Sequence, residues 1–133
     1  MVRMTIAVVL LLVTSSCFLD SAAPPEDVDK AAAQFFSRIK DANYNEVYND
    51  AAKGFKKDKT RDELINNLTD LTSGGRYVGS SRLSTYFTDQ DGKHIGVTTY
   101  LTQFERSKGE VKLFFIDEDG EWKFSGFEFK PRV

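Results

Sequence analysis

Apolar residues follow the repeat of one helical face along residues 28–39. The apolar positions of this stretch are Val28, Ala31, Ala32, Phe35, Phe36 and Ile39. Lys30 and Gln34 stand off this stripe, so the opposite face of the helix is polar. Pro24 and Pro25 can only lie at or before the first turn. The pattern therefore predicts an amphipathic helix over 28–39.

Two further stretches have the same helical spacing. The second runs over 44–55, with apolar positions at Tyr44, Val47, Tyr48, Ala51, Ala52 and Phe55, and Gly54 favours a helix end there. The third opens on Thr60 to Glu63, which match a capping box, and its apolar stripe is Leu64, Leu68 and Leu71. Gly74 and Gly75 end it. We predict three helices before any strand.

From Arg76 onward the apolar period changes from that of a helix to that of a strand. Four stretches rich in Thr, Tyr, Val and Phe follow one another, at 76–87, 94–105, 110–116 and 121–130. Asp91-Gly92 and Asp119-Gly120 favour tight hairpin turns. Helices followed by antiparallel strands indicate an α+β fold, with three N-terminal helices packed on a curved antiparallel sheet of about four strands.

Gly126 interrupts the alternation of the last predicted strand. The apolar positions shift from Trp122 and Phe124 before it to Phe127 and Phe129 after it. One extra residue in a strand has this effect, so we predict a β-bulge that bends the sheet.

The N-terminus carries a different pattern. Arg3 precedes an apolar run from Ile6 to Val13, and the small residues Thr-Ser-Ser then lead to Cys17. A short cationic start, an apolar core of ~7–15 residues and a small-residue region are typical of a secretory signal. A membrane-spanning helix needs ~20 apolar residues, and this run is shorter. We expect export, with a signal peptide at 1–17, a tether at 18–27 and a folded domain at 28–133.

Cys17 has three interpretations. Val-Thr-Ser-Ser-Cys resembles a bacterial lipobox, whose cysteine is diacylated, although Thr14 stands where leucine is usual. Signal cleavage near 20–23 would instead remove the cysteine, and a retained thiol has no activating neighbour. The small, Pro-rich and acidic segment 21–27 suits a short extended tether. This favours lipidation of Cys17 and a periplasmic or cell-surface protein anchored to the membrane by lipid.

Charge and length narrow the function classes. The 133 residues suit one domain. With 18 basic and 20 acidic side chains, the net charge of −2 argues against nucleic acid binding and against adsorption to an anionic membrane. A single cysteine forms no internal disulfide, so packing alone must hold the fold.

With this order of elements, the chain resembles the nuclear-transport-factor-2-like superfamily, whose cystatin-like α+β fold is cone-shaped. More narrowly, it is similar to a group of small secreted bacterial lipoproteins of undefined function. The residues that carry the resemblance are 41–56, where a Tyr-containing helix follows a short turn, and the ending 119–131. The resemblance implies a cavity between the helices and the sheet. Some members are isomerases, dehydratases or hydrolases of small apolar molecules, while others bind ligands or form dimers through the sheet, so the fold does not give the function.

Candidate chemistry in that cavity is limited to tyrosine. Four tyrosines are the predicted cavity-lining residues: Tyr48, Tyr77, Tyr86 and Tyr100. The ketosteroid isomerase-like members add a carboxylate base, and their Asp/Tyr pairing finds no match here. The strand carboxylates stand beside turns or opposite Lys and Arg, as solvent-facing residues do: Glu105, Glu110, Glu121 and Glu128. No catalytic residue is assigned.

Other candidate sites are weak. His94 is the only histidine and follows a turn, where a solvated ring is usual, and no zinc ligand set accompanies it. Neither hairpin has the EF-hand pattern. No metal or cofactor is therefore predicted. The basic cluster Lys53 to Lys59 suits an acidic partner or phospholipid heads, but it is better interpreted as a solvated helix end.

Two functions from different classes remain open. The favoured one is a non-enzymatic, membrane-anchored module that binds a small apolar ligand or an envelope protein, or pairs as a homodimer through the sheet. The alternative is a small-molecule isomerase or hydrolase that uses the cone cavity. An enzyme requires Asp, Glu or His within hydrogen-bond reach of a cavity tyrosine.

Overall fold

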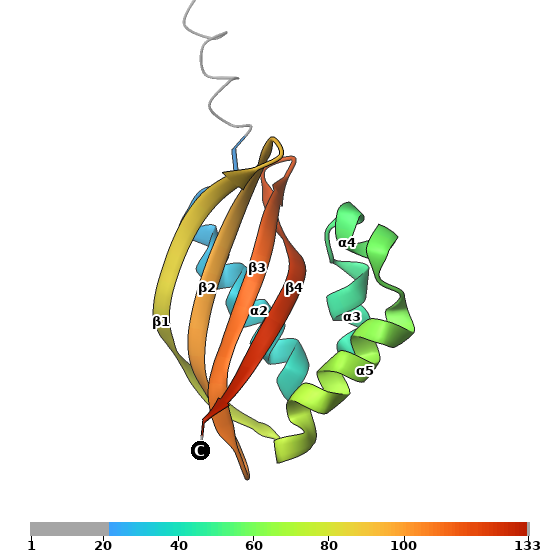
Figure 1. Ribbon diagram of the computed structural model, residues 1–133, viewed down its shortest axis with the longest axis vertical. Coiled ribbons are helices and arrows are strands. Elements are labelled where there is room, and N and C mark those ends of the chain that lie inside the picture. The colour runs from blue at the N-terminus through green and yellow to red at the C-terminus, as the bar shows by residue number, and fades with distance from the viewer. Residues whose placement is uncertain (1–21, 133) are drawn as a thin grey trace, which may run out of the picture.

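A computed structural model describes residues 22–132 and places all of the helices before all of the strands (Figure 1). The helices are α2 (Asp27–Lys40), α3 (Tyr44–Asn49), α4 (Lys53–Asp58) and α5 (Arg61–Leu71), followed by the 3-10 turn η2 (Thr72–Gly74). The strands are β1 (Tyr77–Gln90), β2 (Lys93–Phe104), β3 (Lys108–Glu118) and β4 (Glu121–Arg132). The predicted α+β class is confirmed.

The four strands form one antiparallel sheet in the order β1-β2-β3-β4. Both predicted hairpin turns are confirmed. Asp91 and Gly92 have φ of 52° and 75°, and Asp119 and Gly120 have φ of 54° and 85°. Two consecutive positive φ values match the twist of the flanking strands, which is why Asp-Gly suits these turns.

The bulge predicted at Gly126 is also confirmed. The register between β3 and β4 shifts at Phe114 and Phe115, opposite Gly126. Gly126 itself has φ of 137°, which a residue with a side chain rarely adopts. The shift keeps apolar side chains on one face of β4 on both sides of the bulge.

Helix α2 covers one face of the sheet, called here the inner face, while α3, α4 and α5 lie on the β4 side (Figure 1). Phe35 stacks on Phe124 of β4, with ring centroids 5.4 Å apart. Phe36 stacks on Tyr77 of β1 at 5.2 Å. The inner residues of β3 are at most 2% exposed: Val111, Leu113 and Phe115. Burial of this apolar surface between α2 and the sheet is the main stabilising term of the fold.

The single helix predicted over 44–55 is wrong. The structure has two short helices there, α3 and α4, which brings the described part of the chain to four α-helices instead of three. Between them, Ala51 forms a parallel bridge with Phe124, and the Ala52 backbone N–H donates to the Phe124 carbonyl at 2.8 Å. The backbone bonds to the edge of β4 instead of continuing the helix. Gly54, predicted to end a helix, lies in the first turn of α4.

The segment before α2 differs from the expected extended tether. Ala23 is 4% exposed, and its N–H donates to the Asp117 carboxylate at 2.9 Å. The Trp122 indole donates to the Pro24 carbonyl at 2.8 Å. Residues 23 and 24 therefore pack on the β3–β4 hairpin. Cys17 and the predicted signal lie outside the described residues. None of the helices within 22–132 is long and apolar enough to cross a membrane.

The predicted capping box begins α5. Thr60 Oγ1 accepts from the Glu63 N–H at 3.2 Å, and the Glu63 carboxylate accepts from the Thr60 N–H at 3.0 Å. We expect Thr60→Ala to lower the free energy of unfolding by about 1 kcal/mol, measured by urea denaturation. Thr69→Ala, inside the same helix, is the control and should change it by less. Equal losses would contradict a capping role.

The same cap gives a pH dependence. The bond from the Thr60 backbone, and then that from its side chain, lower the pKa of Glu63 below its ordinary value of 4.5. Because its pKa is lowered in the folded protein, the ionised Glu63 carboxylate stabilises the fold at pH values above 4.5. This stabilisation is lost as the pH falls through the pKa that Glu63 has in the folded protein. Glu63→Gln removes the titrating carboxylate, so urea denaturation at a series of acid pH values should show a flatter stability curve for this variant than for the wild type.

Candidate functional site

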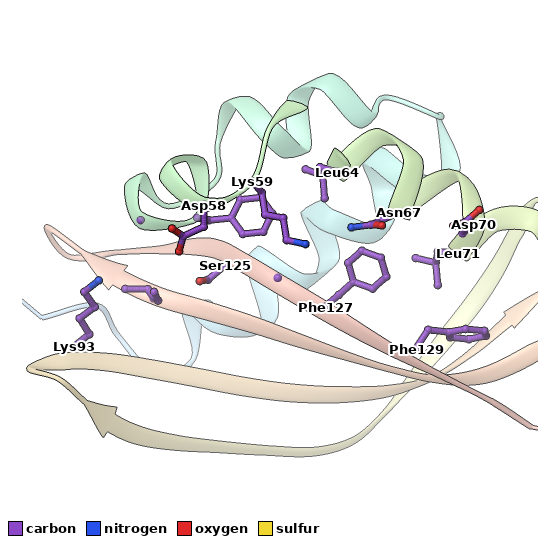
Figure 2. A pocket seen from close by; sticks show the side chains of 14 residues that line it. Asp58, Lys59, Leu64, Asn67, Asp70, Leu71, Lys93, Ser125, Phe127 and Phe129 are labelled. Carbon is purple, nitrogen blue, oxygen red and sulfur yellow. The ribbon is translucent and has the colours of Figure 1, made fainter. Parts of the chain in front are cut away.

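A cavity of about 620 Å³ lies between β4 and the helices α4 and α5, and we call it the β4 groove. Its apolar side chains are Phe55, Leu64, Leu71, Ile116, Phe127 and Phe129. Its polar side chains are Asp58, Lys59, Asn67, Asp70, Lys93 and Ser125. Gly54 and Gly126 complete the lining. The groove thus combines an aromatic and aliphatic floor with a polar rim (Figure 2).

The link between α3 and α4 bonds to the edge of β4 beside the groove. Ala51 and Ala52 bond to Phe124, just before the bulge at Gly126. No atom lies within 4 Å of the position that a Cβ on Gly126 would take. Phe127 and Phe129 follow the bulge, half-buried, and pack against the core beneath the open space.

The charged side chains of the rim have no partners. Among residues 22–132, none of Asp58, Lys59, Asp70 and Lys93 forms an ion pair. Figure 2 shows the Lys59 ammonium and the Asn67 amide pointing into the groove above Phe127, while the Asp70 carboxylate points away from it. Asp58 and Lys93 lie at one end. The rim therefore has charges and hydrogen-bonding groups that are free to meet a ligand.

A second cavity, of about 460 Å³, lies between α2 and the start of β4, and its charged side chains do have partners. Its charges neutralise one another in three ion pairs: Lys30 with Asp27, Arg38 with Asp50, and Lys123 with Glu121. Since these groups already satisfy one another, this cavity is the weaker ligand site.

The four predicted cavity tyrosines are dispersed, and none of them lines the β4 groove. Tyr77 and Tyr100 line a third cavity, of about 370 Å³, beside α2. Tyr48 lies on α3 under Arg61, with the guanidinium 4.8 Å from its ring centroid, and donates to the Lys59 carbonyl at 3.2 Å. Tyr86 is 51% exposed and pairs with Val97 on the outer face of the sheet.

Tyr100 does have a carboxylate neighbour. Its hydroxyl donates to Asp29 Oδ1 at 3.2 Å, and Arg82 donates to Asp29 Oδ2 at 2.6 Å. Burial raises the pKa of Tyr100 above its ordinary value of 10.0, and the negative charge of Asp29 raises it further. A hydrogen bond with Thr98 partly opposes this shift. The Asp29 side chain is 44% exposed and neutralised by Arg82. Asp29 and Tyr100 both line the third cavity, so a carboxylate does lie within hydrogen-bond reach of a cavity tyrosine, as the enzymatic alternative requires. This carboxylate is half-exposed and paired with Arg82, which makes it a weaker general base than a buried, unpaired one.

His94 is packed as well as hydrogen-bonded. Its Nδ1 lies 2.7 Å from Asp89 Oδ1, and its ring stacks on Phe87 with centroids 5.8 Å apart. Within the described part of the chain, no three His, Cys, Asp or Glu side chains are grouped to hold a metal ion. His94 therefore has a packing role at the β1–β2 hairpin.

No family model matches the chain, and no curated protein matches it. The β4 groove must therefore be interpreted from its own geometry.

Proposed function

We propose that this protein is a non-enzymatic binding module whose β4 groove takes one small amphipathic molecule. The observation that carries the proposal is the pairing of an apolar floor with charged rim groups that lack partners. A volume of about 620 Å³ lies within the range of ~300–1,000 Å³ typical of small-molecule sites. The floor supplies apolar contact, and the rim supplies orientation.

Filling the groove tests this proposal. Asn67 and Asn66 are adjacent exposed residues on α5, and only Asn67 lines the groove. We expect the uncharged dye Nile red to bind the protein with enhanced fluorescence. Asn67→Trp should weaken that binding about tenfold or more, because the indole occupies the cavity, an effect of at least ~1.4 kcal/mol.

Asn66→Trp is the matched control, because it adds the same side chain outside the groove. It should bind Nile red as the wild type does, and both variants should keep the wild-type free energy of unfolding. Equal weakening in both variants, or no dye binding by the wild type, would overturn the proposal.

The family and location remain proposals from the sequence. We propose membership of the nuclear-transport-factor-2-like superfamily, with α2 against the inner face of a cone-shaped sheet, supported by the element order and by the packing of α2 on that face. We also propose export and lipid anchoring through Cys17, supported by the pattern of residues 1–17. The chain enters the domain beside the β3–β4 hairpin, so an anchor would hold that end towards the membrane (Figure 1).

Intact mass tests the anchor. Protein from a membrane fraction should have the mass of the chain from Cys17 plus acyl groups, and Cys17→Ser should abolish that species. An unmodified chain that begins after Cys17 would contradict the proposal and indicate a freely diffusing secreted domain.

A second candidate function, self-association, is favoured by the edge strand β1. The exposed large hydrophobic residues of the described chain are all on this strand: Val78 at 63%, Leu83 at 49% and Tyr86 at 51%. The opposite edge, β4, is protected by its bulge, by charged side chains and by Pro131. Residues 84–88 carry no charge, so two copies paired there antiparallel would oppose no like charges.

Sedimentation tests this pairing. We expect the wild type to form dimers and Tyr86→Lys to be monomeric, because a cation on each copy would meet its counterpart. Glu128→Lys on the protected edge β4 should stay dimeric. A monomeric wild type, or a dimer that survives Tyr86→Lys, would exclude the β1 interface.

A further inference from the structure

We infer that the ligand of the β4 groove is an anionic amphiphile, with its apolar body on Phe127 and Phe129 and its anionic group at Lys59. This inference rests on the proposed function and names the ligand class for the same site. It depends on how the backbone holds Lys59, on which rim charges face the groove, and on the form of the β4 edge.

Lys59 is fixed at its backbone and free at its ammonium. It follows α4 directly, and its N–H donates to the Phe55 carbonyl at 2.9 Å. Its carbonyl accepts from the Tyr48 hydroxyl at 3.2 Å. With both backbone groups held, the side chain extends into the groove above Phe127 (Figure 2). The site therefore presents a positioned cation without a partner in the described chain.

The other lysines of this region do not share that arrangement. Lys56 donates to the Asn49 carbonyl at 2.7 Å and lies over the Tyr48 ring, so its ammonium is already engaged. Lys57 is exposed and does not line the groove. Lys93 lines the groove at its end, near Asp58 (Figure 2). Lys59 is the lysine that stands over the aromatic floor.

The charges select an anion over a cation. A carboxylate on the floor would meet the Lys59 ammonium and the Asn67 amide, both of which donate hydrogen bonds. Apolar side chains on one side lower the local dielectric, which strengthens such a pair. A cationic head group would meet Lys59 as a like charge. Asp70 would not offset this, because its carboxylate points out of the groove, and Asp58 lies at the end of the groove towards Lys93 (Figure 2).

The form of the edge favours one small molecule over an added peptide strand. A strand added to β4 needs a regular edge, and this one shifts register at Gly126 and carries Pro131. The link between α3 and α4 also bonds to the edge at Phe124. The cavity of about 620 Å³ instead suits a single molecule, such as a medium-chain carboxylate.

Three probes with the same decyl chain test the ligand class. Decanoate, decanol and decyltrimethylammonium are each used, below their micelle concentrations, to displace Nile red from the purified protein. We expect decanoate to displace the dye at the lowest concentration and decyltrimethylammonium at the highest. Lys59→Gln should weaken decanoate about five- to tenfold, the effect of one partly exposed charged hydrogen bond, and leave decanol unchanged. Lys57→Gln, at an exposed position of α4 outside the groove, should leave the displacement by all three probes unchanged.

The outcomes separate this inference from the proposed function. Equal displacement by the three probes, unaffected by Lys59→Gln, would overturn the anionic ligand and leave the groove as an apolar binding site. If decyltrimethylammonium binds most tightly, the anionic ligand is overturned, and the carboxylates of Asp58 and Asp70 would be the groups that bind a cationic ligand. If Nile red does not bind at all, the proposed function fails with it.

Discussion

Replacing Phe35 with alanine is expected to lower the free energy of unfolding by about 3–5 kcal/mol, because the removed ring connects α2 to the sheet. Phe35 is 3% exposed. It stacks on Phe124 with ring centroids 5.4 Å apart and packs edge-on against Phe36 at 5.4 Å. It also contacts Phe127, 6.2 Å away, on the groove floor. The cavity left by alanine would lie at the centre of this aromatic cluster.

Urea denaturation measures this loss. Gln34→Ala is the control, because Gln34 is the preceding residue of the same helix and is exposed. Gln34→Ala should change the free energy of unfolding by no more than about 0.5 kcal/mol. A loss below about 1 kcal/mol for Phe35→Ala would mean that α2 does not pack on β4 as described.

The second large effect is expected at Gly109, where a side chain has no room. A Cβ on this buried residue of β3 would lie 2.5 Å from the Lys130 carbonyl oxygen and 2.7 Å from the Phe129 ring. Because the nearer atom belongs to the backbone of β4, the strands must move apart. We expect Gly109→Ala to lower the free energy of unfolding by about 1–3 kcal/mol.

The same substitution should also weaken Nile red binding, because Phe129 is part of the groove floor. Gly79→Ala is the matched control, since no atom lies within 4 Å of a Cβ at Gly79 on β1. It should be neutral or stabilise the fold by less than about 1 kcal/mol, through the unfolded state. Equal effects at the two glycines would contradict the described packing of β3 on β4.

The strands and turns could be predicted from the sequence because their signals are local. Asp-Gly pairs fix the two hairpins within a few residues, and the shift from Phe124 to Phe127 marks the bulge. The capping box at Thr60 is equally local. In each case the residues that carry the signal also make the contact.

The break between α3 and α4 could not be predicted in this way. Ala51 and Ala52 keep helical spacing and are buried, at 5% and 0% exposure, as a helix would also have them. What divides the helix is a backbone bond to Phe124, which is distant in the sequence. The spacing of apolar residues indicates which side chains are buried. It does not indicate which partner a backbone N–H or carbonyl group bonds to.

The candidate site was missed for a related reason. Tyrosine chemistry predicts a cavity site for these residues, but alternation along β1 puts Tyr86 on the outer face, where it pairs with Val97. The groove instead combines α4, α5 and the strand after the bulge. Two signals were present in the sequence, namely Phe127 with Phe129 after Gly126, and the basic cluster that ends at Lys59. Only the fold brings them to one place.

The most direct test of the central claim is an amide NMR titration of the protein with decanoate. If the β4 groove is the binding site, the resonances that shift will belong to residues that line it, on α4, α5 and the part of β4 from Ser125 to Phe129. Shifts centred on Tyr77 and Tyr100, or on the outer face around Tyr86, would place the ligand elsewhere. The absence of shifts would contradict the binding function itself.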